Sequence, residues 1–183
     1  MGQKLEKQLN RLNHKPEGLR RAATVVETEA ADVLCLREFQ GSIEDSVHKL
    51  MKEAVVDLNI SDRFYITDNK IECIANGKGT RYKGAARNHS AIKSAEGFKY
   101  SWFEEAQTIS AQTLEDLLPT IRSKDSELWF SANPQSSADP FSQRFIVPYQ
   151  KELERDGYYE DDLHLIVVIN WRDNPWFKDS PLV

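Results

Sequence analysis

Two short apolar runs that lead directly into polar residues constrain the fold of this chain most strongly. Residues 99–103 run straight into the paired acids Glu104 and Glu105, and residues 127–131 form a second run that leads to Asn133. Short, continuous apolar runs are typical of strands that a parallel sheet buries on both faces. Because the carboxyl ends of neighbouring parallel strands meet at one edge of the sheet, we predict that these polar residues share a site.

Paired carboxylates at the end of a buried strand suit phosphoryl transfer. One acid can hold Mg²⁺, and the next can polarise the water that attacks a γ-phosphate, so we assign these roles to Glu104 and Glu105 respectively. Ser131 and Asn133 supply a hydroxyl and an amide that can contact the γ-phosphate or its water and report hydrolysis. Each pair alone also fits an ordinary helix start or turn. Their combination favours the functional interpretation.

The remaining pattern alternates helices with strands. Apolar residues spaced three and four apart predict helices over residues 3–13, 17–31, 43–58, 110–118 and 140–147, and Pro119 is expected to end the fourth. Short apolar runs predict strands over residues 33–36, 64–67, 71–74 and 163–169 and around 81–82. The runs at 64–67, 71–74 and 81–82 are expected to form an inserted β-hairpin or meander, and residues 163–169 a buried strand. The order predicts an α/β three-layer sandwich with a mostly parallel sheet.

The charge balance limits nucleic-acid binding to a local surface. The chain has 183 residues, enough for one domain, and its formal net charge of −5 argues against a generally basic coat. Between residues 78 and 99, however, the only acid is Glu96. This basic run predicts a surface for a phosphate backbone, with a solvated surface as the alternative. The candidate DNA-binding residues are Lys78, Arg81, Lys83, Arg87 and Lys93.

Several other features are assigned structural roles. Cys35 and Cys73 lie in apolar strand-like runs, which favours buried reduced thiols and a cytoplasmic location. No run approaches the roughly 18 apolar residues that a membrane span needs, so no membrane association is expected. Residues 76–80 read NGKGT, which does not satisfy GxxxxGK[ST] and is predicted to be a hairpin turn. His48 and His164 have no partners at ligand spacing and are not read as metal ligands.

In their order along the chain, these motifs resemble the large terminase subunit of tailed bacteriophages, the ATPase of the genome-packaging motor. Residues 102–106 resemble its Walker B strand with the catalytic glutamate, and residues 129–134 resemble its coupling motif. The resemblance spans about residues 32–177 and includes four further blocks, at residues 34–46, 92–97, 118–122 and 170–177.

The resemblance implies a P-loop NTPase-like fold of the ASCE type and an ATP hydrolase that uses ATP and Mg²⁺, with Glu104 as the metal ligand. It also implies translocation of double-stranded DNA through a portal protein into a procapsid, by a homo-oligomeric ring that works with a small terminase subunit in the bacterial cytoplasm. Arg37, at a strand end on the expected nucleotide edge, becomes a candidate nucleotide contact.

The sequence departs from the family pattern at both ends. Residues 1–31 contain no Walker A loop and are expected to form a helical segment in place of the first strand, so the sheet is expected to be incomplete. Residues 32–177 are expected to form the ATPase core and residues 178–183 a tail, with no nuclease domain. We therefore expect a partial or split form of the motor protein that is potentially inactive alone.

Two other functions remain open from the sequence. The first is a non-catalytic assembly or DNA-binding module that is derived from a terminase. The second is a two-metal nuclease site that combines Glu104 and Glu105 with Asp173, although nothing in the sequence places Asp173 near the glutamates.

Overall fold

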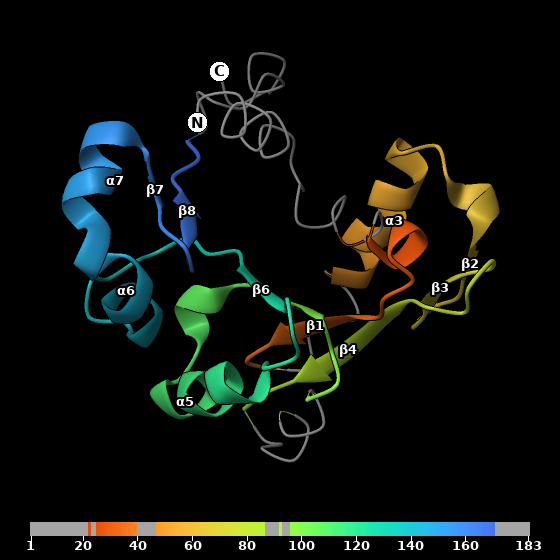
Figure 1. The fold of residues 1–183 in the computed structure, drawn as a ribbon, viewed down its shortest axis with the longest axis horizontal. Helices are drawn as coiled ribbons and strands as arrows, with labels where there is room; N and C mark the ends of the chain where they lie inside the picture. Colours follow the sequence, from red (N-terminus) through yellow and green to blue (C-terminus); the bar gives the residue numbers. More distant parts are fainter. Residues whose placement is uncertain (1–21, 23–24, 40–46, 87–91, 93–95, 171–183) are drawn as a thin grey trace.

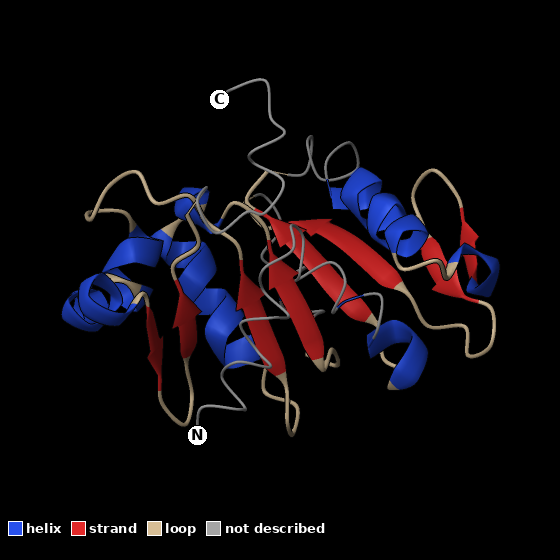
Figure 2. Ribbon diagram, turned by 90° about the horizontal axis from the view of Figure 1, so that it is seen from above, coloured by secondary structure: helices blue, strands red, loops and turns tan. Residues whose placement is uncertain are grey.

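A parallel sheet forms the centre of the computed structural model, which describes residues 22, 25–39, 47–86, 92 and 96–170. Its four strands, seen side by side in Figure 2, lie in the order β4-β1-β5-β6. β1 pairs in parallel with both β4 and β5, and β5 pairs in parallel with β6. The predicted parallel sheet is confirmed, and its strands are β1 (Val33–Arg37), β4 (Thr80–Gly84), β5 (Tyr100–Phe103) and β6 (Glu127–Phe130).

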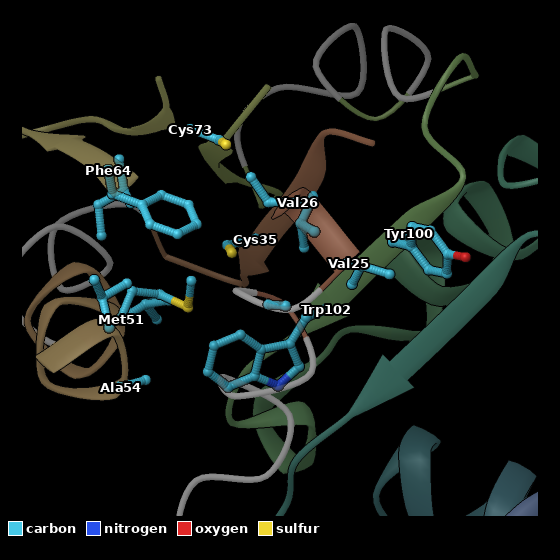
Figure 3. Packing of buried hydrophobic residues seen from close by; sticks show 14 residues of the cluster. Val25, Val26, Cys35, Met51, Ala54, Phe64, Cys73, Tyr100 and Trp102 are labelled. Carbon is cyan, nitrogen blue, oxygen red and sulfur yellow. The ribbon is translucent and has the colours of Figure 1, made fainter. Parts of the chain in front are cut away.

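Helices cover both faces of this sheet, which gives the predicted three layers. β1 is buried along its whole length, with Val33 and Cys35 facing one apolar cluster and Leu34 and Leu36 facing the other. The first cluster includes the helical residues Ala22, Val25 and Val26 and buried residues of helix α3 (Lys49–Asp57), and Figure 3 shows its packing. The second is covered by α5 (Ala111–Thr120) and α6 (Pro140–Phe145).

Local sequence signals fix the ends of the helices that follow the motif strands. α5 begins after Ser110, whose hydroxyl accepts a hydrogen bond from the Thr113 N–H, and α6 begins after Asp139 in the same way. Pro140 occupies the first turn of α6, where its missing N–H costs nothing. The prediction that Pro119 ends α5 at residue 118 is wrong. The helix runs one residue past it, because a proline in the last turn removes only one backbone donor.

The predicted inserted hairpin is present, but it is smaller than expected. β2 (Phe64–Ile66) follows a short 3₁₀ helix, η3 (Ser61–Arg63), and pairs antiparallel with β3 (Ile71–Cys73). The prediction that the stretch around residues 81–82 belongs to this hairpin is wrong, because that stretch forms β4 in the central sheet. The hairpin touches the start of β4 through one isolated bridge between Glu72 and Gly79.

Gly79 explains how the chain changes from one sheet to the other. A Cβ atom at this position would lie 2.0 Å from the Ile71 carbonyl oxygen, so only glycine permits the close approach. The preceding turn is the one predicted for residues 76–80, with Gly77 at a φ of 70°. Beyond Gly79, Thr80 is buried and the Tyr82 ring packs against the first cluster.

The carboxyl-terminal part of the described chain forms a small layer of its own. A 3₁₀ helix, η5 (Val147–Tyr149), leads into α7 (Gln150–Asp156), β7 (Tyr158–Glu160) and β8 (Leu165–Val167). The prediction that residues 163–169 form a buried strand is wrong. β8 pairs antiparallel with β7 in a separate sheet, and Leu165 remains 40% exposed. In Figure 1 this sheet and the β2–β3 hairpin lie at opposite ends of the molecule.

Other sequence predictions have different outcomes. Cys35 and Cys73 are free and buried, as predicted. Four predictions concern residues outside the described part of the chain: the helix predicted for residues 3–13, and the roles considered for Arg87, Lys93 and Asp173. Within the described part of the chain, no helix combines the length and the apolar character that crossing a bilayer requires.

Candidate functional site

The structure brings the ends of the two motif strands together. The register places Phe103 of β5 opposite Phe130 of β6, so the next residues, Glu104 and Ser131, are also neighbours. The Ser131 hydroxyl donates a hydrogen bond to the Glu104 carboxylate. The same hydroxyl accepts a hydrogen bond from the indole Nε1–H of Trp102, at 3.0 Å. Glu104 is therefore held at the end of a chain of side chains that begins in the buried core.

Glu105 leaves the strand in a strained conformation. Its φ and ψ of 54° and 48° lie in the left-handed region, which costs a non-glycine residue about 1–2 kcal/mol. The next residues form a short 3₁₀ helix, η4 (Ala106–Thr108), and Thr108 donates to the Glu105 carbonyl from both its backbone N–H and its hydroxyl. These two bonds stabilise the turn that directs the Glu105 side chain away from the strand.

The guanidinium of Arg37 forms an ion pair with the Glu105 carboxylate. Arg37 is the last residue of β1, and its side chain is 10% exposed, whereas that of Glu105 is 45% exposed. We predicted that Arg37 contacts a nucleotide. That contact stays a prediction; in the structure the Arg37 guanidinium pairs with the glutamate assigned to water activation and is placed to hold that carboxylate in position.

Asn133, which was predicted to be a coupling residue, reaches the same edge through its backbone. Its N–H donates to the side-chain carbonyl oxygen of Gln107, at 3.1 Å, two residues after Glu105. Ala106 N–H donates to the Ser131 carbonyl at 2.9 Å, so two hydrogen bonds connect the loop after β5 with the end of β6. Neither Gln107 nor Trp102 is among the site residues predicted from the sequence. Trp102 shares the strand face of Glu104 by the alternation of a strand, and that signal could have identified it.

A second carboxylate lies at the end of β1 on the opposite face of the sheet. Glu38 is 4% exposed, and its Oε1 accepts a hydrogen bond from the Thr113 hydroxyl at 3.2 Å. Its other oxygen has no hydrogen-bond partner among the described residues. Because Thr113 lies in the first turn of α5, Glu38 connects β1 to the helix that joins the two motif strands.

Burial and the nearby Glu104 carboxylate both affect the thiol of Cys35. Burial raises the pKa of the Cys35 thiol, and the negative charge of Glu104 raises it further. Cys35 is fully buried in β1 and therefore stays a protonated, unreactive thiol.

The two histidines that the structure describes serve structural roles. His48 is buried, and its ring nitrogens bond to the Thr67 carbonyl at 2.7 Å and to the Tyr82 hydroxyl at 3.0 Å. His164 lies 3.1 Å from both carboxylate oxygens of Asp161. Among the described residues, no three His, Cys, Asp or Glu side chains are grouped as a metal site.

Only part of the predicted basic surface lies in the described chain. Lys78 and Arg81 each place a side-chain nitrogen 3.5 Å from the Asp32 carboxylate. Lys83 follows on β4, with the same side-chain direction as Arg81. Asp32 thus partly neutralises the surface proposed for DNA.

The family is decided by a match over most of the chain. The model of the family described as phage terminase large subunit matches residues 22–182. The chain belongs to this family. No curated protein matches the chain.

Solved structures agree on the fold of this terminase chain. It resembles the N-terminal domain of the DNA packaging ATPase from bacteriophage phi29, with a TM-score of 0.62 and 12% identity over 86% of each chain. It also resembles the phi-28 gp11 DNA packaging motor, with a TM-score of 0.56 and 14% identity over 90% of this chain and 57% of that one. A third match is the large terminase of the thermophilic bacteriophage D6E, with a TM-score of 0.50 and 13% identity over 77% of this chain and 41% of that one. At these identities the likeness shows the fold alone.

Proposed function

We propose that this terminase chain is the ATPase-type domain of a DNA-packaging motor, with its core at residues 32–177, and that it uses ATP hydrolysis to drive double-stranded viral DNA into a procapsid. The observation that carries the proposal is the junction of Glu104 and Ser131 at the ends of neighbouring parallel strands, beside the Arg37–Glu105 pair. Ligands of open α/β sheets bind at this edge.

The residues at this edge fit a magnesium nucleotide. Carboxylate and hydroxyl oxygens are the hard donors that Mg²⁺ prefers, and Glu104 with Ser131 supplies both. In the proposed site Glu104 would hold the metal, and a bound metal would supply positive charge beside the transferring phosphoryl group. Glu105 orients and deprotonates the attacking water, and Ser131 and Asn133 transmit the state of the phosphate to the rest of the domain.

A Mg-ATP titration of the full chain tests this function. We expect saturable binding that Glu104→Ala weakens at least tenfold, and binding without turnover in Glu105→Gln. Glu96→Gln is the matched control, because Glu96 is an exposed glutamate that pairs with Arg122 at the surface. The control should bind and hydrolyse ATP as the unmodified chain does. Absence of binding at millimolar nucleotide would contradict an ATPase function of this chain.

The partners of the proposed motor follow from its task. We propose that the chain acts on double-stranded DNA, through Lys78, Arg81 and Lys83, in the host cytoplasm. In the complete motor it would work as a homo-oligomeric ring with a portal protein and a small terminase subunit.

A non-catalytic assembly or DNA-binding module is the second candidate. It is favoured by the engagement of Glu105 with Arg37. Binding of double-stranded DNA by a folded chain that shows no affinity for Mg-ATP would support this candidate over the ATPase.

A further inference from the structure

The hydrogen-bond ladder between β5 and β6 ends in an unusual way. Glu127 N–H donates to the Lys99 carbonyl at 2.8 Å, and Ser131 N–H donates to the Phe103 carbonyl at 3.1 Å. The bonds of a parallel ladder repeat at even spacing, so the next N–H on this side of β6, that of Asn133, should reach the Glu105 carbonyl. It instead meets the Gln107 side-chain oxygen at 3.1 Å.

The Glu105 carbonyl is already engaged by its own turn. The left-handed conformation of Glu105 brings this carbonyl to Thr108, which donates to it from the backbone at 2.9 Å and from the hydroxyl at 2.8 Å. The turn also shifts the partner of the Ser131 carbonyl to Ala106 N–H, one residue later than a regular ladder would give. The backbone of β5 therefore cannot supply an acceptor for Asn133.

We propose that Gln107 is a positioning residue whose side-chain carbonyl replaces the backbone carbonyl of Glu105 in the sheet ladder. This replacement lets Glu105 turn out of the strand toward Arg37 while the end of β6 stays attached at Asn133. The inference deepens the proposed function, because it names the residue that connects the water-activating glutamate to the coupling motif.

The connection has a mechanical consequence. Gln107 lies two residues after Glu105 in a short 3₁₀ helix, and the buried Ala106 between them is bonded to Ser131. A displacement of Asn133 therefore pulls on the loop that sets the position of the Glu105 carboxylate. In the same way, a movement of Glu105 away from Arg37 displaces the end of β6 through these hydrogen bonds.

Three variants separate the acceptor role from the bulk of the side chain. Gln107→Leu keeps the size and removes the acceptor, and Gln107→Glu keeps an acceptor oxygen. Gln112→Leu makes the same change at an exposed glutamine on α5 and serves as the control. The readouts are the hydrogen-exchange rate of the Asn133 amide and the chemical shifts of the Glu105 and Ala106 amides, measured by NMR on the full chain.

We expect Gln107→Leu to speed exchange of the Asn133 amide about fivefold, as the removal of one hydrogen bond implies, and to move the Glu105 and Ala106 resonances. Gln107→Glu and Gln112→Leu should stay within twofold of the unmodified chain. Unchanged exchange in Gln107→Leu would overturn the proposal. So would a Gln107→Glu variant that behaves like Gln107→Leu.

ATP turnover provides the functional arm. Gln107→Leu should lower kcat for ATP about tenfold with KM within twofold, and Gln107→Glu should restore kcat, because the bond positions Glu105 and makes no contact with the nucleotide. An unchanged kcat in a variant without the Asn133 bond would overturn the link to Glu105. If the unmodified chain hydrolyses no ATP, the proposed function fails, whereas the exchange rates and amide shifts still decide the role of Gln107.

Discussion

At the scale of single residues, the candidate site is defined by an asymmetric ion pair. The side chain of Arg37 is largely buried, whereas the side chain of Glu105 is nearly half exposed. Without its partner, Glu105 can rotate into water, but Arg37 cannot leave the core without disturbing β1. The two halves of the pair should therefore respond differently to mutation, because the loss of one partner costs a buried charge more than it costs an exposed one.

We predict that Glu105→Ala destabilises the fold more than Arg37→Met does. Glu105→Ala leaves a buried cation without this partner and should lower the free energy of unfolding by about 2–3 kcal/mol, whereas Arg37→Met keeps most of the apolar stem and should cost about 1 kcal/mol. Urea unfolding of both variants and of the double variant measures the coupling. Arg122→Met, which breaks an exposed pair with Glu96, should change the free energy of unfolding by less than about 0.5 kcal/mol. Equal costs for the two site variants would contradict the burial argument.

The sequence predicts those contacts of the site that follow from the register of the sheet, and it does not predict the others. The junction of Glu104 with Ser131 follows from two parallel strands that end together, which apolar patterning can reveal. The contacts of Arg37 and Gln107 depend on a left-handed turn at Glu105, and no pattern marks a glutamate for that conformation. Their partners became visible only in the structure.

At the scale of elements, the buried strands were predicted well and the peripheral ones were not. β1 and β5 carry continuous apolar runs because both of their faces are buried, whereas β6 lies at the edge of the sheet and its residues are only half-buried. The run at residues 163–169 looks the same in sequence, yet β8 belongs to a separate two-stranded sheet. Apolar composition reports an affinity for burial, but it does not report which neighbour provides the pairing. β4 was misplaced for a different reason, since the turn predicted for residues 76–80 suggested that it continues the hairpin, whereas it pairs with β1.

The attachment of α3 to the hairpin and to β4 depends on one buried histidine. The Thr67 carbonyl can only accept, so His48 donates to it from Nε2 and accepts from the Tyr82 hydroxyl at Nδ1. We predict that His48→Leu lowers the free energy of unfolding by about 2–3 kcal/mol, because the Thr67 carbonyl and the Tyr82 hydroxyl, both partly buried, each lose one hydrogen bond. Thermal unfolding checks this, with the exposed neighbour Lys49→Leu as a control that should have little effect. A His48→Leu variant as stable as the control would contradict the role.

The turn between β7 and β8 should be sensitive to acid. The pKa of Asp161 is lowered chiefly by the hydrogen bond from the His164 side chain, and also by the backbone N–H groups of Leu163 and His164 and by the Tyr159 hydroxyl. A carboxyl whose pKa is lower in the folded state stabilises that state above its unfolded pKa of about 3.9, and the stabilisation is lost as the pH falls through the folded value.

We therefore predict that the β7–β8 hairpin loosens below about pH 4. Asp161→Asn should remove this pH dependence while it lowers the stability of the hairpin at neutral pH. NMR shifts of the Tyr159 and His164 rings, followed from about pH 7 to about pH 2, measure the local transition. An identical acid profile in the unmodified chain and in Asp161→Asn would rule out Asp161 as its origin.

At the scale of the whole molecule, electrostatics limits how the chain can hold DNA. A net charge of −5 repels a polyanion, so binding must come from the local basic residues on β4 and the turn before it. Asp32 contacts Lys78 and Arg81, and its negative charge reduces the attraction of these two residues for DNA. The chain alone should therefore bind double-stranded DNA weakly and only at low salt, since few phosphate charges are neutralised.

The salt dependence of binding gives this argument a quantitative test. Removing one cation that neutralises a phosphate should reduce the slope of log K against log salt concentration by about 0.9, so Arg81→Gln combined with Lys83→Gln should reduce it by about 2. Asp32→Asn should act in the opposite direction, because it removes the charge that competes with DNA and keeps an oxygen to accept from the Gly79 N–H. Lys124→Gln combined with Lys151→Gln removes the same charge from exposed sites outside this surface and serves as the control. Fluorescence anisotropy with a short duplex, from about 20 to about 200 mM salt, measures all the slopes. If the control pair lowers the slope as much as the β4 pair does, binding follows net charge alone and the β4 residues form no specific surface.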